Sequence, residues 1–388
     1  MKSQLSAAKY IRNNKRTGFV LILALGLTFM AMYVIAYLLY TTSESTKPIC
    51  FELPRKIVCC SLSTASLGVN YDDYEDVGQF VKAREKARTN LTEKLSSDPD
   101  VVKAYYTQVL YAPYNGVVGG IGYEFPLLPP EEVPFVVKHL GAELVEGRMP
   151  EGEGEVLIDE RVMKNGGMKL GGWFQKAGYG EVFKIVGVLR SDCMGCVGTP
   201  RGGYNSGVGF VVLCNDNSNN LRELLAKYGV IVSQDNGDNI YDVEDYRNLY
   251  EEDIRKTIDD VINVILLTVM VFLSISVVVA YVSFMRNRVG EYCLYASIGY
   301  SRSDIYGMMM REMLVMFIAG ILLGAVTTVG MVALLRGILI EPRGLSAQWF
   351  MKEQLLRILG SFACIIGVLQ IPMAVTVQKI KTIDLMED

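Results

Sequence analysis

Residues 284–312, FMRNRVGEYCLYASIGYSRSDIYGMMMRE, decide how the chain is organised, because they separate two long apolar runs. The stretch carries four arginines and is therefore expected to face the cytoplasm. After Gly290, apolar positions recur at helical spacing, which predicts a short amphipathic helix that ends at Gly299. Ser301 or Ser303 can then cap the next helix. A short helix that connects two spanning helices on the cytoplasmic side is suited to docking on a cytoplasmic partner.

The apolar runs predict the membrane topology. Residues 18–40 contain no charge, and at about 1.5 Å per residue this run spans a bilayer core of about 30 Å. A basic segment without acidic residues precedes it and no cleavage site follows it, so we expect an uncleaved first helix with its N-terminus inside. Lys379 and Lys381 place the C-terminus inside as well. The predicted transmembrane helices are 18–41, 259–285, 308–335 and 355–377.

The segments between these helices differ in charge. Residues 42–258 contain 23 basic and 32 acidic residues, whereas the rest of the chain contains 15 and 10. An acidic exterior and a basic membrane part indicate a multi-pass protein of the cell membrane, in contact with lipids and not with nucleic acid. The remaining segments are a cytoplasmic basic segment (1–17), an extracytoplasmic domain (42–258), a cytoplasmic coupling loop (286–307), an extracytoplasmic loop (336–354) and a cytoplasmic tail (378–388).

The large segment mixes helical and strand patterns. Residues 76–95 repeat apolar positions at helical spacing, and residues 101–110, 183–189 and 230–233 favour strands. From residue 243 the pattern is helical without Gly or Pro, which predicts a stalk continuous with the second spanning helix. We therefore expect an α+β membrane protein: four transmembrane helices with a large extracytoplasmic α+β domain between the first and second.

The loop also shows a spaced motif. Arg288-x-x-Glu291 is followed by Gly299, then by Asp304-Ile305, and then by Glu312. This pattern resembles the loop between the second and third spanning helices of FtsX/MacB-type ABC transporter permeases. In the large segment, a second set resembles the periplasmic core of MacB-like exporters: Gly147, Arg148, Pro150, Glu155 and Val156.

The resemblance implies a function. It implies a permease subunit that pairs with a second copy or a paralogue and binds a separate cytoplasmic ABC ATPase through the six loop residues. ATP and Mg would be bound by that ATPase and no cofactor by this chain, which contains no P-loop motif of its own. The ATPase would drive conformational change across the membrane (mechanotransmission), with export of a peptide, antibiotic or lipid-linked substrate, release of a lipoprotein, or activation of a cell-wall hydrolase. An adaptor or extracellular protein would be a further partner.

Several residues have two interpretations. Arg288 and Glu291 either contact the ATPase or hold the short helix in shape. Glu312 either couples to the partner or acts structurally, capping the helix or pairing with Arg311. Gly320-x-x-x-Gly324 predicts close helix packing and, less directly, contact between two permease copies.

Six cysteines fall in the predicted exterior: Cys50, Cys59, Cys60, Cys193, Cys196 and Cys214. An even number in an oxidising space suggests disulfides. The Cys193–Cys196 spacing is that of a redox or metal half-site, but its glycine-rich surroundings favour a structural disulfide or free thiols. We expect no catalytic residue and no metal site, and hence no enzyme. The rival function is a membrane sensor that reports to a cytoplasmic partner, or a regulator of cell-wall hydrolases, without substrate transport.

Overall fold

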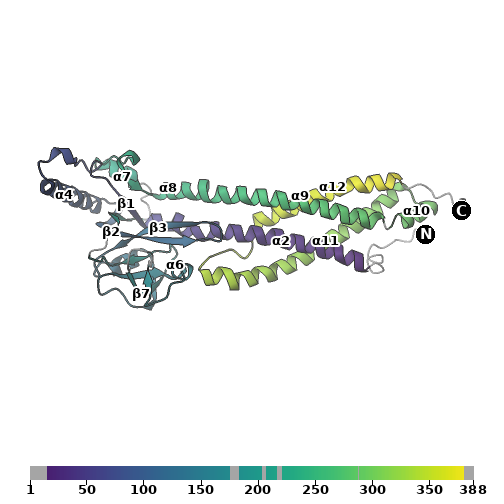
Figure 1. Ribbon diagram of the computed structural model, residues 1–388, viewed down its shortest axis with the longest axis horizontal. Coiled ribbons are helices and arrows are strands. Elements are labelled where there is room, and N and C mark those ends of the chain that lie inside the picture. Colours follow the sequence, from purple (N-terminus) through teal and green to yellow (C-terminus); the bar gives the residue numbers. More distant parts are fainter. Residues whose placement is uncertain (1–14, 175–182, 203–206, 216–220, 287, 380–388) are drawn as a thin grey trace. The chain divides into compact units, whose positions relative to one another are not determined.

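A computed structural model describes residues 15–174, 183–202, 207–215, 221–286 and 288–379 (Figure 1). The predicted terminal segments 1–17 and 378–388 lie almost entirely outside these ranges. The chain divides into two compact units. A membrane unit comprises residues 1–39, 259–337 and 348–388, and a sheet unit comprises residues 40–258 and 338–347.

The membrane unit is built from long apolar helices joined by one short helix. Four helical stretches are long and apolar enough to cross a membrane, which confirms the predicted fold class of four spanning helices with an α+β domain. The helices are α2 (Lys15–Lys47), α9 (Lys256–Arg286), α10 (Val289–Ser297), α11 (Arg302–Leu335) and α12 (Lys352–Lys379).

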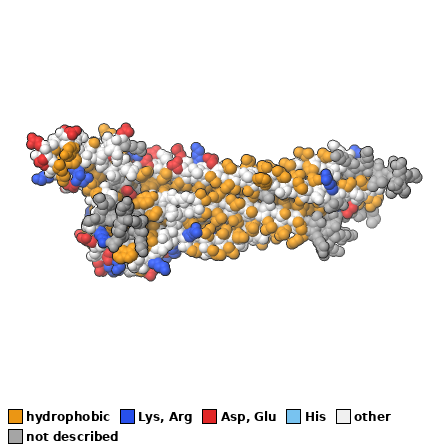
Figure 2. Space-filling model, viewed as in Figure 1, with side chains coloured by type: hydrophobic (Ala, Val, Ile, Leu, Met, Phe, Trp, Pro, Cys, Tyr) orange, Lys and Arg blue, Asp and Glu red, His pale blue; other side chains and the backbone are white. Residues whose placement is uncertain are grey.

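Aromatic side chains pack where α2, α11 and α12 meet. The rings of Phe29 and Phe362 lie 5.8 Å apart, and Phe317 approaches Phe362 to 6.3 Å, both edge-to-face. Such ring pairs add about 0.5–1.5 kcal/mol beyond the area that they bury. The outward faces stay apolar and exposed, as the hydrophobic side chains over these helices in Figure 2 show, and they suit contact with lipid tails.

The sheet unit contains a mixed sheet with ten strands among the described residues. Its strand order is β10-β1-β9-β2-β3-β8-β5-β7-β4, with β6 on β7; pairing is mostly antiparallel, but β5–β7 and β3–β8 are parallel. The strands are β1 (Ile57–Ser61), β2 (Val101–Asn115), β3 (Gly120–Leu127), β4 (Glu143–Gly147), β5 (Glu155–Asp159), β6 (Trp173–Phe174), β7 (Phe183–Arg190), β8 (Val197–Gly198), β9 (Gly207–Cys214) and β10 (Asn239–Ile240).

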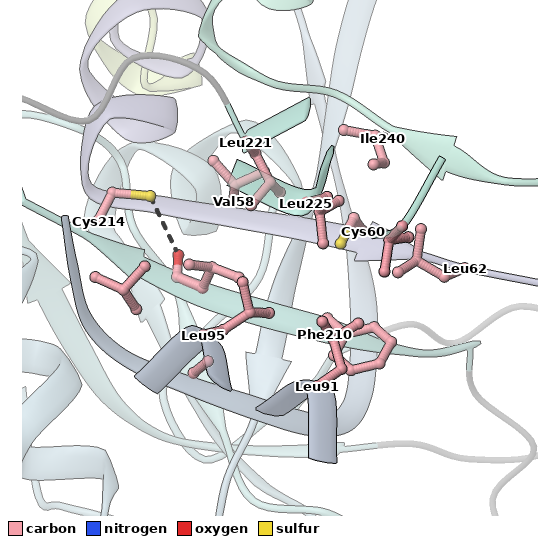
Figure 3. Packing of buried hydrophobic residues seen from close by; sticks show 14 residues of the cluster. Val58, Cys60, Leu62, Leu91, Leu95, Phe210, Cys214, Leu221, Leu225 and Ile240 are labelled. Atoms are coloured by element: carbon pink, nitrogen blue, oxygen red, sulfur yellow. Dashed lines mark hydrogen bonds between the residues drawn. The ribbon is translucent and has the colours of Figure 1, made fainter. Parts of the chain in front are cut away.

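One face of the sheet is covered by α4 (Val77–Ser96), which begins at the capping side chain of Asp76. Alternate residues of β1 and β9 point into this core, because strand side chains alternate between faces, and Leu91 and Leu95 of α4 meet them (Figure 3). Val77 and Val81 belong to the apolar repeat of residues 76–95, but both are exposed, because only the C-terminal half of α4 reaches the core.

A buried carboxylate joins α4 to the following segments. Asp98 accepts hydrogen bonds from Lys227 Nζ (2.5 Å), Tyr228 Oη (2.7 Å) and the backbone N–H of Asp100 (3.1 Å). The Lys227 hydrogen bond is the main reason why the pKa of Asp98 falls to about 2. The charged form of Asp98 therefore stabilises the fold.

The predicted strand at 230–233 is not present. Val230 is buried, but Asp238 accepts the backbone N–H groups of Ser63 (2.6 Å) and Ser233 (2.9 Å), and the chain turns there. The strand that pairs with this part of β1 is β10, not residues 230–233. The other helices of this unit are α3 (Leu53–Lys56), α5 (Val133–His139), α6 (Glu160–Asn165), α7 (Leu221–Lys227) and α8 (Val243–Asn248).

The predicted stalk is helical from Val243 to Arg286. Between α8 and α9 it widens into a π-helical turn at Leu249–Arg255. Tyr250 in this turn is buried, and its hydroxyl group lies 2.7 Å from the Oγ of Ser43.

The connection between α11 and α12 is more than a loop. Residues 338–347 belong to the sheet unit, where Tyr114 Oη donates to the carbonyl oxygen of Gly344 (2.8 Å). Asn165 Nδ2 donates to the carbonyl oxygen of Arg343 (3.1 Å), and the N–H of Ser346 donates to Ser45 Oγ (2.9 Å). This segment is therefore a structural part of the domain.

Candidate functional site

The loop between α9 and α11 folds around α10. Arg288 stands at the N-cap of α10, and Gly299 adopts φ +95°, a left-handed conformation that glycine reaches without strain. Ser301 then caps α11: its hydroxyl accepts the N–H of Asp304 (3.1 Å), and the Asp304 carboxylate accepts the N–H of Ser301 (3.2 Å). Of the two predicted caps, Ser301 is the one used. Gly299 therefore ends α10 and Ser301 begins α11, which fixes both ends of the turn between these helices.

A buried ion cluster lies behind α10. Arg288 is only 3% exposed, and its Nε donates to Glu291 Oε2 (3.1 Å) while its Nη1 donates to Glu312 Oε2. Glu312, on α11, is also 3% exposed. An arginine can hold two carboxylates in this way because its planar guanidinium carries several N–H donors. The cluster therefore ties the start of α10 to α11.

Aromatic rings complete the surroundings of the guanidinium. Its Cζ lies 5.6 Å from the ring centre of Phe284 and 5.0 Å from that of Tyr292. Tyr281 packs against Phe284 (5.9 Å between ring centres), and its hydroxyl donates to the carbonyl oxygen of Met309 (3.2 Å). These rings exclude water from the arginine and strengthen its attraction to Glu312.

The two faces of α10 differ sharply. Tyr292 and Cys293 are buried, whereas Leu294 is 57% and Ile298 67% exposed. Leu294 and Ile298 are four residues apart and so lie on the same face, one turn from Glu291, which is also exposed. We call Glu291, Leu294 and Ile298 the α10 face. It presents two large apolar side chains and one carboxylate to the surroundings.

The structure brings together only some of the predicted loop residues. Arg288, Glu291 and Glu312 form the cluster, and Glu312 binds Arg288 in place of the expected Arg311. Asp304 and Gly299 shape the turn, while Ile305 is buried at 1% exposure. Arg288, Glu312 and Ile305 are therefore positioning residues.

Sequence reasoning missed the rings on either side of Arg288. Phe284, Arg288 and Tyr292 follow one another at intervals of four, a helical spacing that was available as a signal.

The glycines of α11 pack against α2. A Cβ atom on Gly320 would lie 2.6 Å from Leu25 Cβ, and one on Gly324 would lie 2.8 Å from the carbonyl oxygen of Gly26. Gly26 is the member of this contact that the sequence analysis did not name. The close approach occurs within one chain, which agrees with the predicted helix packing; the predicted contact with a second permease copy stays a prediction.

The six cysteines of the predicted exterior form no disulfide with one another in the structure, although all six are described residues. Cys59 and Cys60 point to opposite faces of β1, as strand neighbours do. Cys193 and Cys196 are buried, and burial raises the pKa of Cys196 to about 12. Such thiols stay protonated and unreactive, so the Cys193–Cys196 pair is placed for packing.

Comparison with known proteins identifies the part of the chain that contains α10. Residues 263–385 match the FtsX-like permease C-terminal family. The match spans most of α9 and all of α10, α11 and α12, and it confirms the resemblance seen in the loop residues. No curated protein matches the chain.

Among solved structures, the chain is similar to a crystallised domain of a protein from Porphyromonas gingivalis assigned as a permease. The two share 14% identity over 39% of this chain and 75% of that domain, with a TM-score of 0.20, which carries no structural argument.

Proposed function

We propose that this chain is the membrane subunit of an ABC-type complex and that the α10 face docks a separate cytoplasmic ATPase. The proposal rests on the FtsX-like match of residues 263–385 together with the geometry of α10. The single observation that carries it is an exposed apolar face on a short helix whose opposite side is fixed by a buried ion cluster.

A docking helix must be rigid, and α10 has the means. Arg288 is held by Glu312, and a displaced α10 would have to separate these buried charges, which costs several kcal/mol. The two exposed side chains then supply affinity. Burying one large apolar side chain contributes about 1.5–3 kcal/mol, so Leu294 and Ile298 together make a small but useful anchor.

The orientation follows from the same assignment. With α10 cytoplasmic, both termini are cytoplasmic and the sheet unit is extracytoplasmic. The ATPase binds ATP and Mg, and its ATP hydrolysis drives conformational change in the membrane helices. The sheet unit carries out the resulting function outside the membrane. We propose export or extrusion of a peptide, antibiotic or lipid-linked substrate. A second copy or a paralogue pairs with this chain in the membrane.

Retention of the ATPase tests the docking. The full chain is purified from its native membrane as wild type and as Leu294→Asp/Ile298→Asp, and bound proteins are identified by mass spectrometry alongside ATP hydrolysis. We expect the wild type to retain an ABC-type ATPase. The variant should retain at least about tenfold less of this ATPase, equivalent to a loss of about 1.4 kcal/mol in binding free energy. Ser303→Asp is the matched control, because it adds a charge in the same loop outside α10.

Two outcomes contradict the proposal. Undiminished ATPase in the Leu294→Asp/Ile298→Asp preparation would make α10 a simple connector. Recovery of a signalling kinase and of no ATPase would favour the sensor alternative.

The orientation has its own test. Cysteines placed at Ser297 and at Pro342, both exposed, are added singly to a variant that lacks the eight native cysteines. A membrane-impermeant thiol reagent applied to whole cells should label only the Pro342 position. Labelling of both positions from outside would overturn the orientation.

A further inference from the structure

A second candidate site lies within the sheet unit. A cavity of about 230 Å³ is enclosed by β1, β2, β3, α3 and the segment that leads into α8. Four tyrosines and one carboxylate belong to its lining: Tyr111, Tyr123, Tyr241, Tyr246 and Glu124. Tyr123 is buried, with its hydroxyl donating to the carbonyl oxygen of Met194, so the other three rings are the candidates for ligand contact. None of these residues belongs to the α10 site, and the proposed function does not use them.

The rings form walls on more than one side. Tyr241 and Tyr246 lie 5.7 Å apart between ring centres, tilted by 48°. Tyr111 on β2 is paired directly with Glu124 on β3, so their side chains project from the same face of the sheet. The Tyr111 ring occupies the space above Gly122, where an added Cβ would come within 1.9 Å of the ring. Glycine at this position thus makes room for the third ring.

The charge in this cavity is not balanced by the protein. Glu124 is the one carboxylate of the lining, which contains no Lys or Arg. Burial raises the pKa of Glu124, and among the described residues no charged or hydrogen-bonding partner of its carboxylate contributes to this shift. Cys59, whose Sγ donates to the backbone carbonyl of Glu124 (3.7 Å), remains a neutral thiol because burial raises its pKa far above the ordinary value. A partly buried carboxylate without a cation is costly.

We propose that this cavity binds an alkylammonium group. Tyrosine faces attract cations through the ring quadrupole, and a cage of rings with a carboxylate suits a cation whose charge is spread over methyl groups. A primary ammonium has three N–H donors to satisfy, whereas Glu124 is the one carboxylate of a lining whose other polar side chains are Asn239 and the tyrosines and whose remaining wall is apolar, as at Leu53, Pro54 and Ile57.

The cavity size limits the ligand. It is smaller than the pockets of about 300–1,000 Å³ that enclose drug-sized molecules, so a head group fits and a bulky ligand does not. The same chemistry occurs in a free small cation such as choline and in a choline-type lipid head group.

Calorimetry on the full chain tests the proposal. The protein is purified in a neutral glycoside detergent and titrated with choline and with dimethylbutanol, its neutral isostere. We expect saturable binding of choline and at least tenfold weaker binding of dimethylbutanol. Competition by nanodiscs of phosphatidylcholine, but not of phosphatidylglycerol, would assign the lipid head group as the source; absence of competition would assign the free cation.

Variants separate the cage from general effects. Glu124→Gln, which preserves shape, and Tyr241→Leu, at a ring that is 47% exposed, should each weaken choline binding at least tenfold. Glu131→Gln removes an exposed carboxylate outside the lining and should leave binding unchanged. Thermal unfolding checks that all variants fold.

The proposal is overturned if choline does not bind the wild type, if dimethylbutanol binds equally well, or if neither Glu124→Gln nor Tyr241→Leu weakens binding. Tighter binding of acetyl-lysine amide than of choline would overturn the preference for an alkylated cation.

Discussion

Removing Arg288 gives the sharpest test of the α10 cluster. In Arg288→Met, Glu312 keeps its place on α11 at 3% exposure but loses the guanidinium that binds it. Breaking a buried ion pair by removing one partner costs about 3–5 kcal/mol, because the remaining charge is uncompensated. We therefore expect the free energy of unfolding to fall by that amount.

The partner change should be less costly. In Glu312→Leu, Arg288 can still bind Glu291, whose side chain is 46% exposed and partly solvated, so we expect a loss of about 3 kcal/mol, at the low end of the range. The double variant Arg288→Met/Glu312→Leu leaves no buried charge. It should be less destabilised than the sum of the single variants by at least about 2 kcal/mol.

The measurement is reversible unfolding in mixed detergent micelles, followed by circular dichroism. Arg286→Met is the matched control, because Arg286 is exposed two residues earlier and its loss should change stability by no more than about 0.5 kcal/mol. If Arg288→Met costs no more than Arg286→Met, or if the single effects simply add, the cluster does not hold α10.

Further predictions concern backbone, charge and packing. Gly299→Ala should lower the free energy of unfolding by about 1–2 kcal/mol, because φ is +95° there. At Gly290, within α10, an added Cβ has no atom within 4 Å, so Gly290→Ala should raise the free energy of unfolding by about 0.5–1 kcal/mol in the same assay. Asp98→Asn should weaken the dependence of the free energy of unfolding on acidic pH. In the wild type, the stabilising contribution of Asp98 is complete above its ordinary pKa of 3.8 and is lost as pH falls through about 2. Unfolding measured across this pH range should therefore show a loss of stability in the wild type that the variant lacks. Gly320→Ala should cost about 1–3 kcal/mol by overpacking α2 against α11, whereas Gly330→Ala, with no neighbour within 4 Å, should not; equal melting temperatures for the two would contradict this packing.

Local signals in the sequence were sufficient for the loop. Gly299 and Ser301 predict where α10 ends and α11 begins because backbone conformation and capping depend on neighbouring residues alone. The spanning helices are predictable for a similar reason, since a long apolar run must satisfy its backbone internally in a membrane.

Contacts between distant residues were not predictable in the same way. Arg288 and Glu312 are both conspicuous in the sequence, but nothing local shows that they bind each other across 24 positions. Their pairing depends on how α9, α10 and α11 pack. For the same reason the sequence suggests Arg311, the neighbour of Glu312, as its partner, whereas Arg311 is exposed and the buried Glu312 binds Arg288.

The sheet shows the limit most clearly. Strands β2 and β7 lie where the sequence predicts strands, at 101–110 and 183–189, but the order of strands is set by long-range pairing. Residues 230–233 contain β-branched side chains and read as a strand, yet the buried carboxylate of Asp238 takes the backbone N–H groups needed for pairing. Such competition is visible only when the partners are in place.

The inclusion of residues 338–347 in the sheet unit has a consequence for dissecting the protein. The chain passes between the two units four times, after residues 39, 258, 337 and 347, so each of the four long helices is covalently joined to the sheet unit. The domain is therefore not an insertion that can be excised at two points. A fragment ending at residue 258 would leave the Tyr114 hydroxyl buried without its Gly344 acceptor, and supplying residues 338–347 as a separate peptide should restore part of the lost stability.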